Sequence, residues 1–171
     1  MTSLVLTVVG ADRAGLVATV AEVVDAHGGN WERSELAELS GTFAGVIEVS
    51  VPPQRADELR EALTVVDGFV TVVVPTGQAA VPSTERRLVV RVLGNDRPGI
   101  VREITAVLSG SGISIERMTT SSRDAAMAGG RLFEAAVTAS VPVSTDVDAV
   151  VSRLEDLATD IQVDVQVLAA D

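Results

Sequence analysis

The chain has 171 residues, a formal net charge of −11 and a composition that is 47% hydrophobic but only 2% aromatic, so aliphatic side chains must build any core. The absence of cysteine excludes disulfides and thiolate metal sites, and a single histidine excludes sites with several histidine ligands. The acidic balance argues against direct binding of nucleic acid, which needs a basic surface. With no membrane-length apolar run and no evident signal peptide, we expect a cytoplasmic protein without a membrane anchor.

The first half of the chain alternates between strand and helix patterns. Residues 4–9 are rich in β-branched residues and predict a strand buried on both faces. An apolar stripe at helical spacing follows at Val17, Val20, Ala21 and Val24. Gly28 ends this helix, and a second helical stripe begins at Leu59. The remaining strands are expected at residues 30–39, 43–51 and 69–74.

The second half repeats the same order of elements. Proline and small residues between 76 and 85 predict a linker, which divides the chain into domains at 1–75 and 86–171. The strands of the second domain are expected at residues 88–93, 113–122, 132–141 and 161–167. Its helical stripes are Val101, Ile104, Thr105 and Leu108, and then Val147, Val150, Val151, Leu154 and Ala158.

The two halves are copies of one unit. Residues 4–34 align with 88–118 without a gap, and about a dozen of these roughly thirty positions are identical, which is typical of an internal repeat. The second copy has about six additional residues around 122–130, which predict a longer hairpin between its middle strands. The order βαββαβ in each copy predicts an α+β protein of two tandem ferredoxin-like domains. Each would be a four-stranded antiparallel sheet with two helices on one face.

A turn with the same sequence pattern lies between the first strand and first helix of each copy. It is Gly-Ala-Asp-Arg-Ala-Gly-Leu-Val from residue 10 and Gly-Asn-Asp-Arg-Pro-Gly-Ile-Val from residue 94. Free backbone N–H groups at a helix start can hold an anionic or zwitterionic ligand. Such a turn therefore predicts a binding site for a small molecule in each copy.

Each residue type in the turn also has a structural explanation. The aspartates Asp12 and Asp96 could cap the helix, bind a ligand amino group, or do both. The glycines Gly15 and Gly99 could allow close backbone packing in the first helical turn or leave room for a ligand. The arginines could be solvated, paired with an acid, or in contact with the ligand. Pro98 suits the start of a helix.

The turn pattern, together with Gly-x-Asn-Trp at residues 28–31 and Gly-x-Ser-Ile at 112–115, resembles the ACT domain. Two such domains with little else resemble the glycine cleavage system transcriptional repressor family. The resemblance implies amino-acid binding by the turn and by the start of the second strand, although Gly10 and Gly94 replace a polar residue of some relatives. The implied ligand-binding residues are Gly10, Ala11, Asp12, Arg13, Gly15, Leu16, Asn30, Gly94, Asn95, Asp96, Arg97, Pro98, Gly99, Ile100 and Ser114.

We therefore expect a non-enzymatic regulatory protein. No nucleophile–base pair, Walker motif or dinucleotide-binding motif occurs in the sequence, and no cofactor or metal is implied. The resemblance implies that an amino acid, with glycine or serine as first candidates, binds at ACT-domain interfaces and controls a partner such as a transcription factor. The domains would pair within the chain or across a homodimer, and a homodimer is the expected oligomer. The alternative is a ligand-free protein-interaction module, in which the turn only caps a helix.

Overall fold

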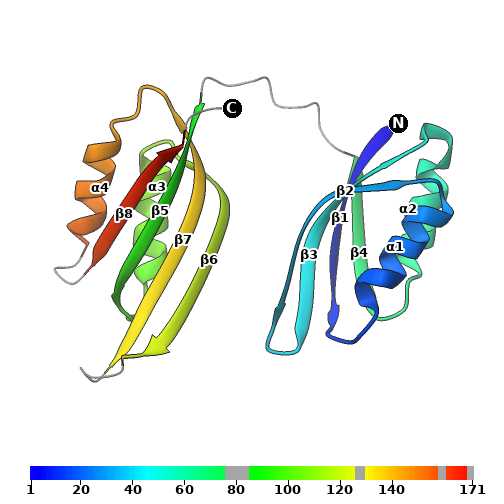
Figure 1. Ribbon diagram of the computed structural model, residues 1–171, viewed down its shortest axis with the longest axis horizontal. Helices are drawn as coiled ribbons and strands as arrows, with labels where there is room; N and C mark the ends of the chain where they lie inside the picture. Colours follow the sequence, from blue (N-terminus) through cyan, green and yellow to red (C-terminus); the bar gives the residue numbers. More distant parts are fainter. Residues whose placement is uncertain (76–84, 126–129, 158–160, 169–171) are drawn as a thin grey trace. The chain divides into compact units, whose positions relative to one another are not determined.

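A computed structural model describes residues 1–75, 85–125, 130–157 and 161–168 of the chain. The backbone contacts divide the chain into two units, Met1–Ala80 and Val81–Asp171, and each is described by itself (Figure 1). The linker expected at 76–85 lies outside the described residues, except that Glu85 already belongs to a strand.

The first unit has the expected order of strands and helices. A short 3-10 turn at Pro53–Arg55 leads into the second helix. The elements are β1 (Thr2–Ala11), α1 (Leu16–Ala26), β2 (Asn30–Leu39), β3 (Thr42–Val51), α2 (Ala56–Thr64) and β4 (Phe69–Pro75).

The second unit repeats this order. Its helix α4 begins with an aspartate cap that the sequence analysis did not single out, in which the Asp146 carboxylate accepts a hydrogen bond from the Ala149 N–H at 3.2 Å. The elements are β5 (Glu85–Asn95), α3 (Ile100–Gly110), β6 (Ser114–Asp124), β7 (Arg131–Pro142), α4 (Val147–Glu155) and β8 (Gln162–Leu168).

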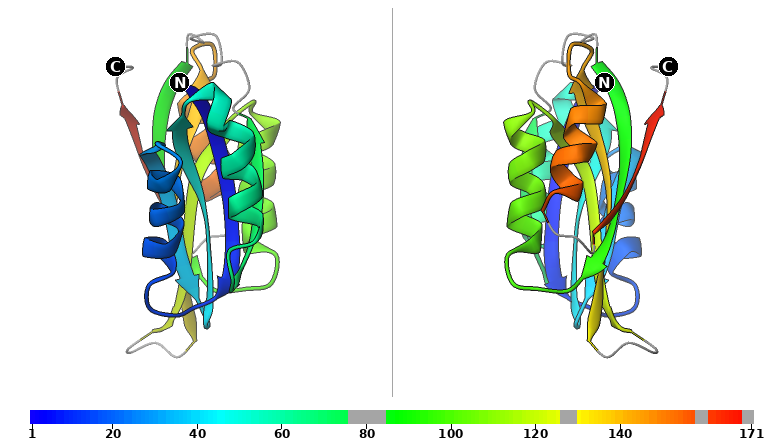
Figure 2. Two further views of the ribbon diagram at one scale, coloured as in Figure 1. Left: turned by 90° about the vertical axis from the view of Figure 1, so that its right-hand side faces the viewer. Right: turned by 90° about the vertical axis from the view of Figure 1, so that its left-hand side faces the viewer.

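Each unit is a ferredoxin-like domain, which confirms the predicted fold class. The strand orders are β2-β3-β1-β4 and β6-β7-β5-β8, and all pairings are antiparallel. Both helices of a unit lie on one face of its sheet (Figure 2). The end of β1 pairs with the start of β3, so the turn after β1 lies beside the β2–β3 hairpin.

The core of each domain lies between the helices and one face of the sheet. Both cores consist mainly of aliphatic side chains, as the composition predicts, with Phe133 buried among those of the second. The first core contains Leu4, Leu6, Val8, Leu16, Val20, Val24, Ile47, Val49, Val51, Leu59 and Leu63. Leu88, Ile104, Leu108, Val137 and Leu154 are among the most buried side chains of the second.

The prediction that strand 4–9 is buried on both faces is wrong. Leu4, Leu6 and Val8 are buried, but the alternate residues Thr7 and Val9 are exposed. The reason is that an antiparallel sheet of this fold has helices on one face only, so successive side chains alternate between core and surface.

The first-helix stripes begin one residue earlier than predicted. Leu16 and Ile100 are buried, whereas Val17 and Val101 are each 40% exposed. Each helix begins at the residue directly after its turn glycine, which rotates the first residue toward the sheet and the second toward the surface. The predicted stripe residue Ala158 lies outside the described residues.

Candidate functional site

The turn between the first strand and the first helix has the same backbone in both domains. Gly15 has φ 89° and ψ −2°, and Gly99 has φ 89° and ψ −3°. These angles belong to the third residue of a type II turn, where only glycine is unstrained, and Pro98 fits the second position. The Ile100 N–H donates to the Arg97 carbonyl at 3.3 Å and closes the second turn.

The backbone conformation of the turn requires glycine at both positions. The explanation that these glycines allow another backbone to pack closely is wrong. A Cβ added at Gly15 would meet no atom within 4 Å, and one at Gly99 would come no closer than 3.5 Å to the tip of Arg102. On this side the first turn thus faces open space, and the second turn faces the exposed tip of Arg102. Pro98 precedes the capping glycine, so it lies in the turn and not in the first helical turn.

The aspartates of the turn do not cap the helices. Gly15 and Gly99 occupy the N-cap positions, and neither helix has a side-chain cap. The backbone N–H of Asp12 instead donates to the Gly41 carbonyl of the neighbouring hairpin at 2.8 Å, and that of Asp96 donates to the Arg131 carbonyl at 2.8 Å. Helix α1 begins four residues after Asp12 in the chain, too late for the carboxylate to reach its first N–H groups.

The arginines of the turns, Arg13 and Arg97, donate hydrogen bonds to carbonyl groups of the segment that precedes the last strand of each domain. Arg13 Nη2 donates to the Asp67 carbonyl at 2.7 Å, and its guanidinium lies over Gly68. Arg97 Nη2 donates to the Leu157 carbonyl at 3.3 Å. This role is structural and is the same in both domains.

In the second domain, the turn arginine also contacts a carboxylate, that of Glu103. Arg97 makes two hydrogen bonds to the Glu103 carboxylate, at 3.1 and 2.5 Å. These bonds lower the pKa of Glu103 below its ordinary value of 4.5, against a smaller effect of desolvation. The guanidinium of Arg97 is therefore committed to contacts within the domain.

The other predicted turn residues lie at the ends of β1 and β5 or at the first positions of α1 and α3. Gly10 and Ala11 end β1 opposite Phe43 and Thr42, and Gly94 and Asn95 end β5 opposite Phe133 and Leu132. Leu16 and Ile100 are buried, so they anchor the helix start in the core and cannot face a ligand.

Asn30 does not lie near the turn of its own domain. It pairs with Ser50 at the far end of β3, whereas Ala11 pairs with Thr42 at the near end. At about 3.3 Å per strand residue, these ends lie roughly 26 Å apart. Ser114 is likewise paired with Ser140, at the far end of β7 from Asn95. The structure thus brings the turn residues together and separates the second-strand residues from them.

A bulged glutamate occupies that far end of the first sheet. Glu32 accepts hydrogen bonds from the Ser50 hydroxyl at 2.5 Å and the Asn30 amide at 3.1 Å. These two bonds lower the pKa of the Glu32 carboxyl below its ordinary value. Asn30 is therefore engaged within its own sheet.

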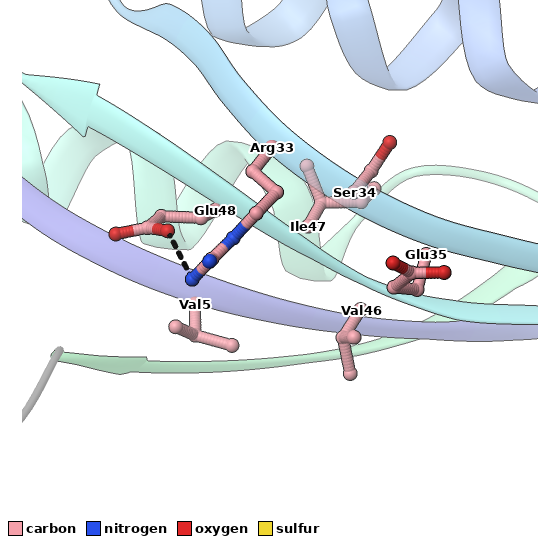
Figure 3. Close-up of a pocket in the computed structure, with 7 residues that line it drawn as sticks. All are labelled: Val5, Arg33, Ser34, Glu35, Val46, Ile47 and Glu48. Carbon is pink, nitrogen blue, oxygen red and sulfur yellow. Dashed lines mark hydrogen bonds and ion pairs between the residues drawn. The ribbon is translucent and has the colours of Figure 1, made fainter. Parts of the chain in front are cut away.

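A shallow hollow on the helix-free face of the first sheet lies apart from the predicted site. Val5, Ser34, Glu35, Val46 and Ile47 line it together with an ion pair of 3.0 Å between Arg33 and Glu48 (Figure 3). None of the predicted ligand-binding residues lines this hollow.

The sequence analysis missed the hairpin residues that close the turn, Gly41 and Arg131, because strand pairing brings them there from far along the chain. Among the described residues, no group of three or more potential side-chain ligands could hold a metal ion. Within the same residues, every helix is too short or too polar to cross a membrane.

Comparison with known families identifies the domains. A model of the ACT domain matches residues 2–66, and a second ACT-domain model matches residues 88–159. The two matches together span most of the chain, and each lies within one of the two ferredoxin-like units. The chain thus belongs to the ACT-domain family and carries two ACT domains in tandem.

Solved structures match nearly the whole length of this chain. An unknown protein from Galdieria sulphuraria is 28% identical with a TM-score of 0.81, and the match covers 98% of this chain and 99% of that one. A candidate glycine cleavage system transcriptional repressor is 20% identical with a TM-score of 0.69, covering 99% and 98%. At 20% identity, the match to this repressor structure establishes a shared fold and not a shared function. A search of curated proteins found no significant match.

Proposed function

We propose that the protein is a non-enzymatic cytoplasmic regulator that binds a small amino acid at its ACT-domain turns and controls a protein partner. Glycine and serine are the first candidates, since a structural neighbour is a candidate repressor of the glycine cleavage system. The partner would be a regulatory protein such as a transcription factor, because the chain itself carries a net charge of −11.

The observation that carries this proposal is the repetition of one open turn. Both turns have a glycine with the same left-handed backbone conformation, and a Cβ added at Gly15 would meet no atom within 4 Å. Arg13 and Arg97 donate to carbonyl groups of their own domains, which holds the turn in place. The aspartates are the anionic side chains of the turn and would therefore meet a ligand amine. At such a turn, the ammonium group of the ligand would contact the aspartate, and its carboxylate would accept hydrogen bonds from the backbone N–H groups.

Regulation would follow from preferential binding to one of two arrangements. A ligand shifts a conformational equilibrium only by as much as its affinities for the two states differ. We propose a homodimer in which the ligand-bound arrangement presents a changed surface to the partner. Asn30 and Ser114 would then contribute only at the turn of another domain, because they lie at the far end of their own sheets.

Thermal unfolding in the presence of single amino acids tests the proposal. A ligand that binds the folded state raises its stability by about 2.7 kcal/mol at one hundred times Kd. We expect a saturating rise in Tm with glycine or serine, and its loss in the double variant Asp12→Asn/Asp96→Asn. The variant Asp25→Asn, which removes an exposed carboxylate near the other end of α1, is the matched control. No rise with any amino acid up to millimolar concentration would refute amino-acid binding.

One observation favours a second candidate, a ligand-free interaction module. The helix-free face of the first sheet exposes Val9 by 38% and Val46 by 45%, an apolar surface of the kind that partners cover. In that case Val46→Arg would abolish partner binding, whereas the double aspartate variant would leave it unchanged. A pull-down with the two variants side by side separates these functions.

A further inference from the structure

The two turns differ in the charged residues around them. The position after the first glycine is Ala11 in one copy and Asn95 in the other. Two charged residues of α3, Arg102 and Glu103, replace Ala18 and Thr19 of α1. The hairpin residue whose carbonyl accepts from the turn aspartate is Gly41 in the first domain and Arg131 in the second.

The last difference places a cation beside the second turn aspartate. Arg131 Nε lies 3.8 Å from Asp96 Oδ2, and the two side chains are 60% and 24% exposed. An ion pair this long and this exposed is weak, so a ligand can separate it at little cost. The arginine remains available for a second partner.

The first turn has no such cation. Within the described residues, the Asp12 carboxylate makes no hydrogen bond and no ion pair, and the hairpin offers only the backbone of Gly41. Arg13 is bound to the Asp67 carbonyl and packed over Gly68. The first turn therefore presents an anion alone, whereas the second presents an anion and a cation side by side.

We propose, on the basis of the function proposed above, that the second domain alone holds the amino acid. Asp96 receives the ammonium group, and Arg131 receives the carboxylate through charge-assisted hydrogen bonds. A zwitterion matches both charges there and only one at Asp12. Arg131 is thus the residue that selects an amino acid over a simple amine, and each chain binds one ligand.

Other arginines near the second turn are less suited to this role. Arg97 is committed to Glu103 and to the Leu157 carbonyl. Arg102 is 82% exposed and lies 3.8 Å from the same Glu103 carboxylate, with its tip beside Gly99. Arg102 lies close to the turn, but its ion pair is with Glu103 and not with Asp96, so Arg102→Ala is a matched control for the loss of one positive charge.

Isothermal titration of the full-length protein with glycine and with glycinamide tests the assignment. Glycinamide keeps the amine but lacks the carboxylate. We expect one glycine per chain, and about ten- to hundredfold weaker glycine binding in Arg131→Ala with unchanged glycinamide binding. Asp96→Asn should weaken both compounds and should weaken glycine far more than Asp12→Asn does, whereas Arg102→Ala should keep glycine affinity within about twofold.

The outcomes separate this assignment from the wider function. Three results would overturn the assignment and leave amino-acid binding intact. The first is a stoichiometry of two glycines per chain, and the second is an equal loss of glycine affinity in Asp12→Asn and Asp96→Asn. The third is an equal loss of affinity for glycine and glycinamide in Arg131→Ala. Absence of binding by the unaltered protein to glycine and to every other amino acid in the thermal panel would overturn both. Circular dichroism of each variant verifies that lost binding is not lost folding.

Discussion

Replacing Gly15 by alanine tests whether the turn needs glycine for its backbone and not for packing. With φ at 89°, an L-residue at this position costs about 1–2 kcal/mol, because its Cβ crowds the adjacent carbonyl. No neighbouring atom lies within 4 Å of the added Cβ, so steric overlap adds nothing. Alanine also restricts the unfolded chain, which returns about 0.4–1 kcal/mol. The net loss is therefore about 1 kcal/mol, equivalent to a fall in Tm of about 4–8 °C for a domain of this size.

The fluorescence of Trp31 can measure this loss in the first domain. Trp31 is the single tryptophan of the sequence, and it packs against the core of that domain. With an m-value of about 1 kcal/mol/M, Gly15→Ala should lower the urea midpoint by about 1 M. Gly15→Asn should lose about half as much, since asparagine tolerates the left-handed conformation better. A neutral alanine variant, or an asparagine variant less stable than alanine, would contradict the conformational explanation.

Three further changes have expected outcomes that urea denaturation can check. Gly45→Ala places a Cβ 2.3 Å from the Glu35 carbonyl, so it should destabilise the first domain by about 1–3 kcal/mol or more, and an unchanged urea midpoint would contradict this. Asp146→Ala removes the cap of α4 and should cost about 0.5–2 kcal/mol, with Asp146→Asn nearly neutral. The pKa of Glu103 is lowered on folding, so its ion pair with Arg97 stabilises above pH 4.5 and this contribution disappears as the pH falls through the folded pKa. Glu103→Gln should therefore show a smaller loss of stability between pH 6 and pH 3 than the unaltered protein.

The fold could be predicted from the sequence because local patterns and the internal repeat agree. Strand and helix periods, the glycines that end helices and the repeat of the whole order each point to a βαββαβ unit. The side of each element that faces the core was harder to predict. Val9 and Val17 are as apolar as their buried neighbours, and only the one-sided layer of helices decides that they face outward.

The candidate site could be predicted only where it is continuous in the chain. The turn from Gly10 to Leu16 is local, and its glycine and arginine are recognisable from sequence. The hairpin residues Gly41 and Arg131 reach the turn through strand pairing, which composition and spacing do not reveal. The same pairing places Asn30 far from the turn of its domain, although Asn30 follows Leu16 by only fourteen positions in the chain.

The strand order has a consequence for how the protein emerges from the ribosome. In each domain the first strand is central, and one of its two neighbours is the last strand to be synthesised, β4 for β1 and β8 for β5. Such pairing between distant segments delays folding, because the intervening chain must be ordered before the contacts form. A nascent chain that ends before Phe69 would therefore leave β1 with one bare edge, open to pairing with any other strand. Each newly made domain therefore keeps one unpaired sheet edge until its fourth strand has left the exit tunnel.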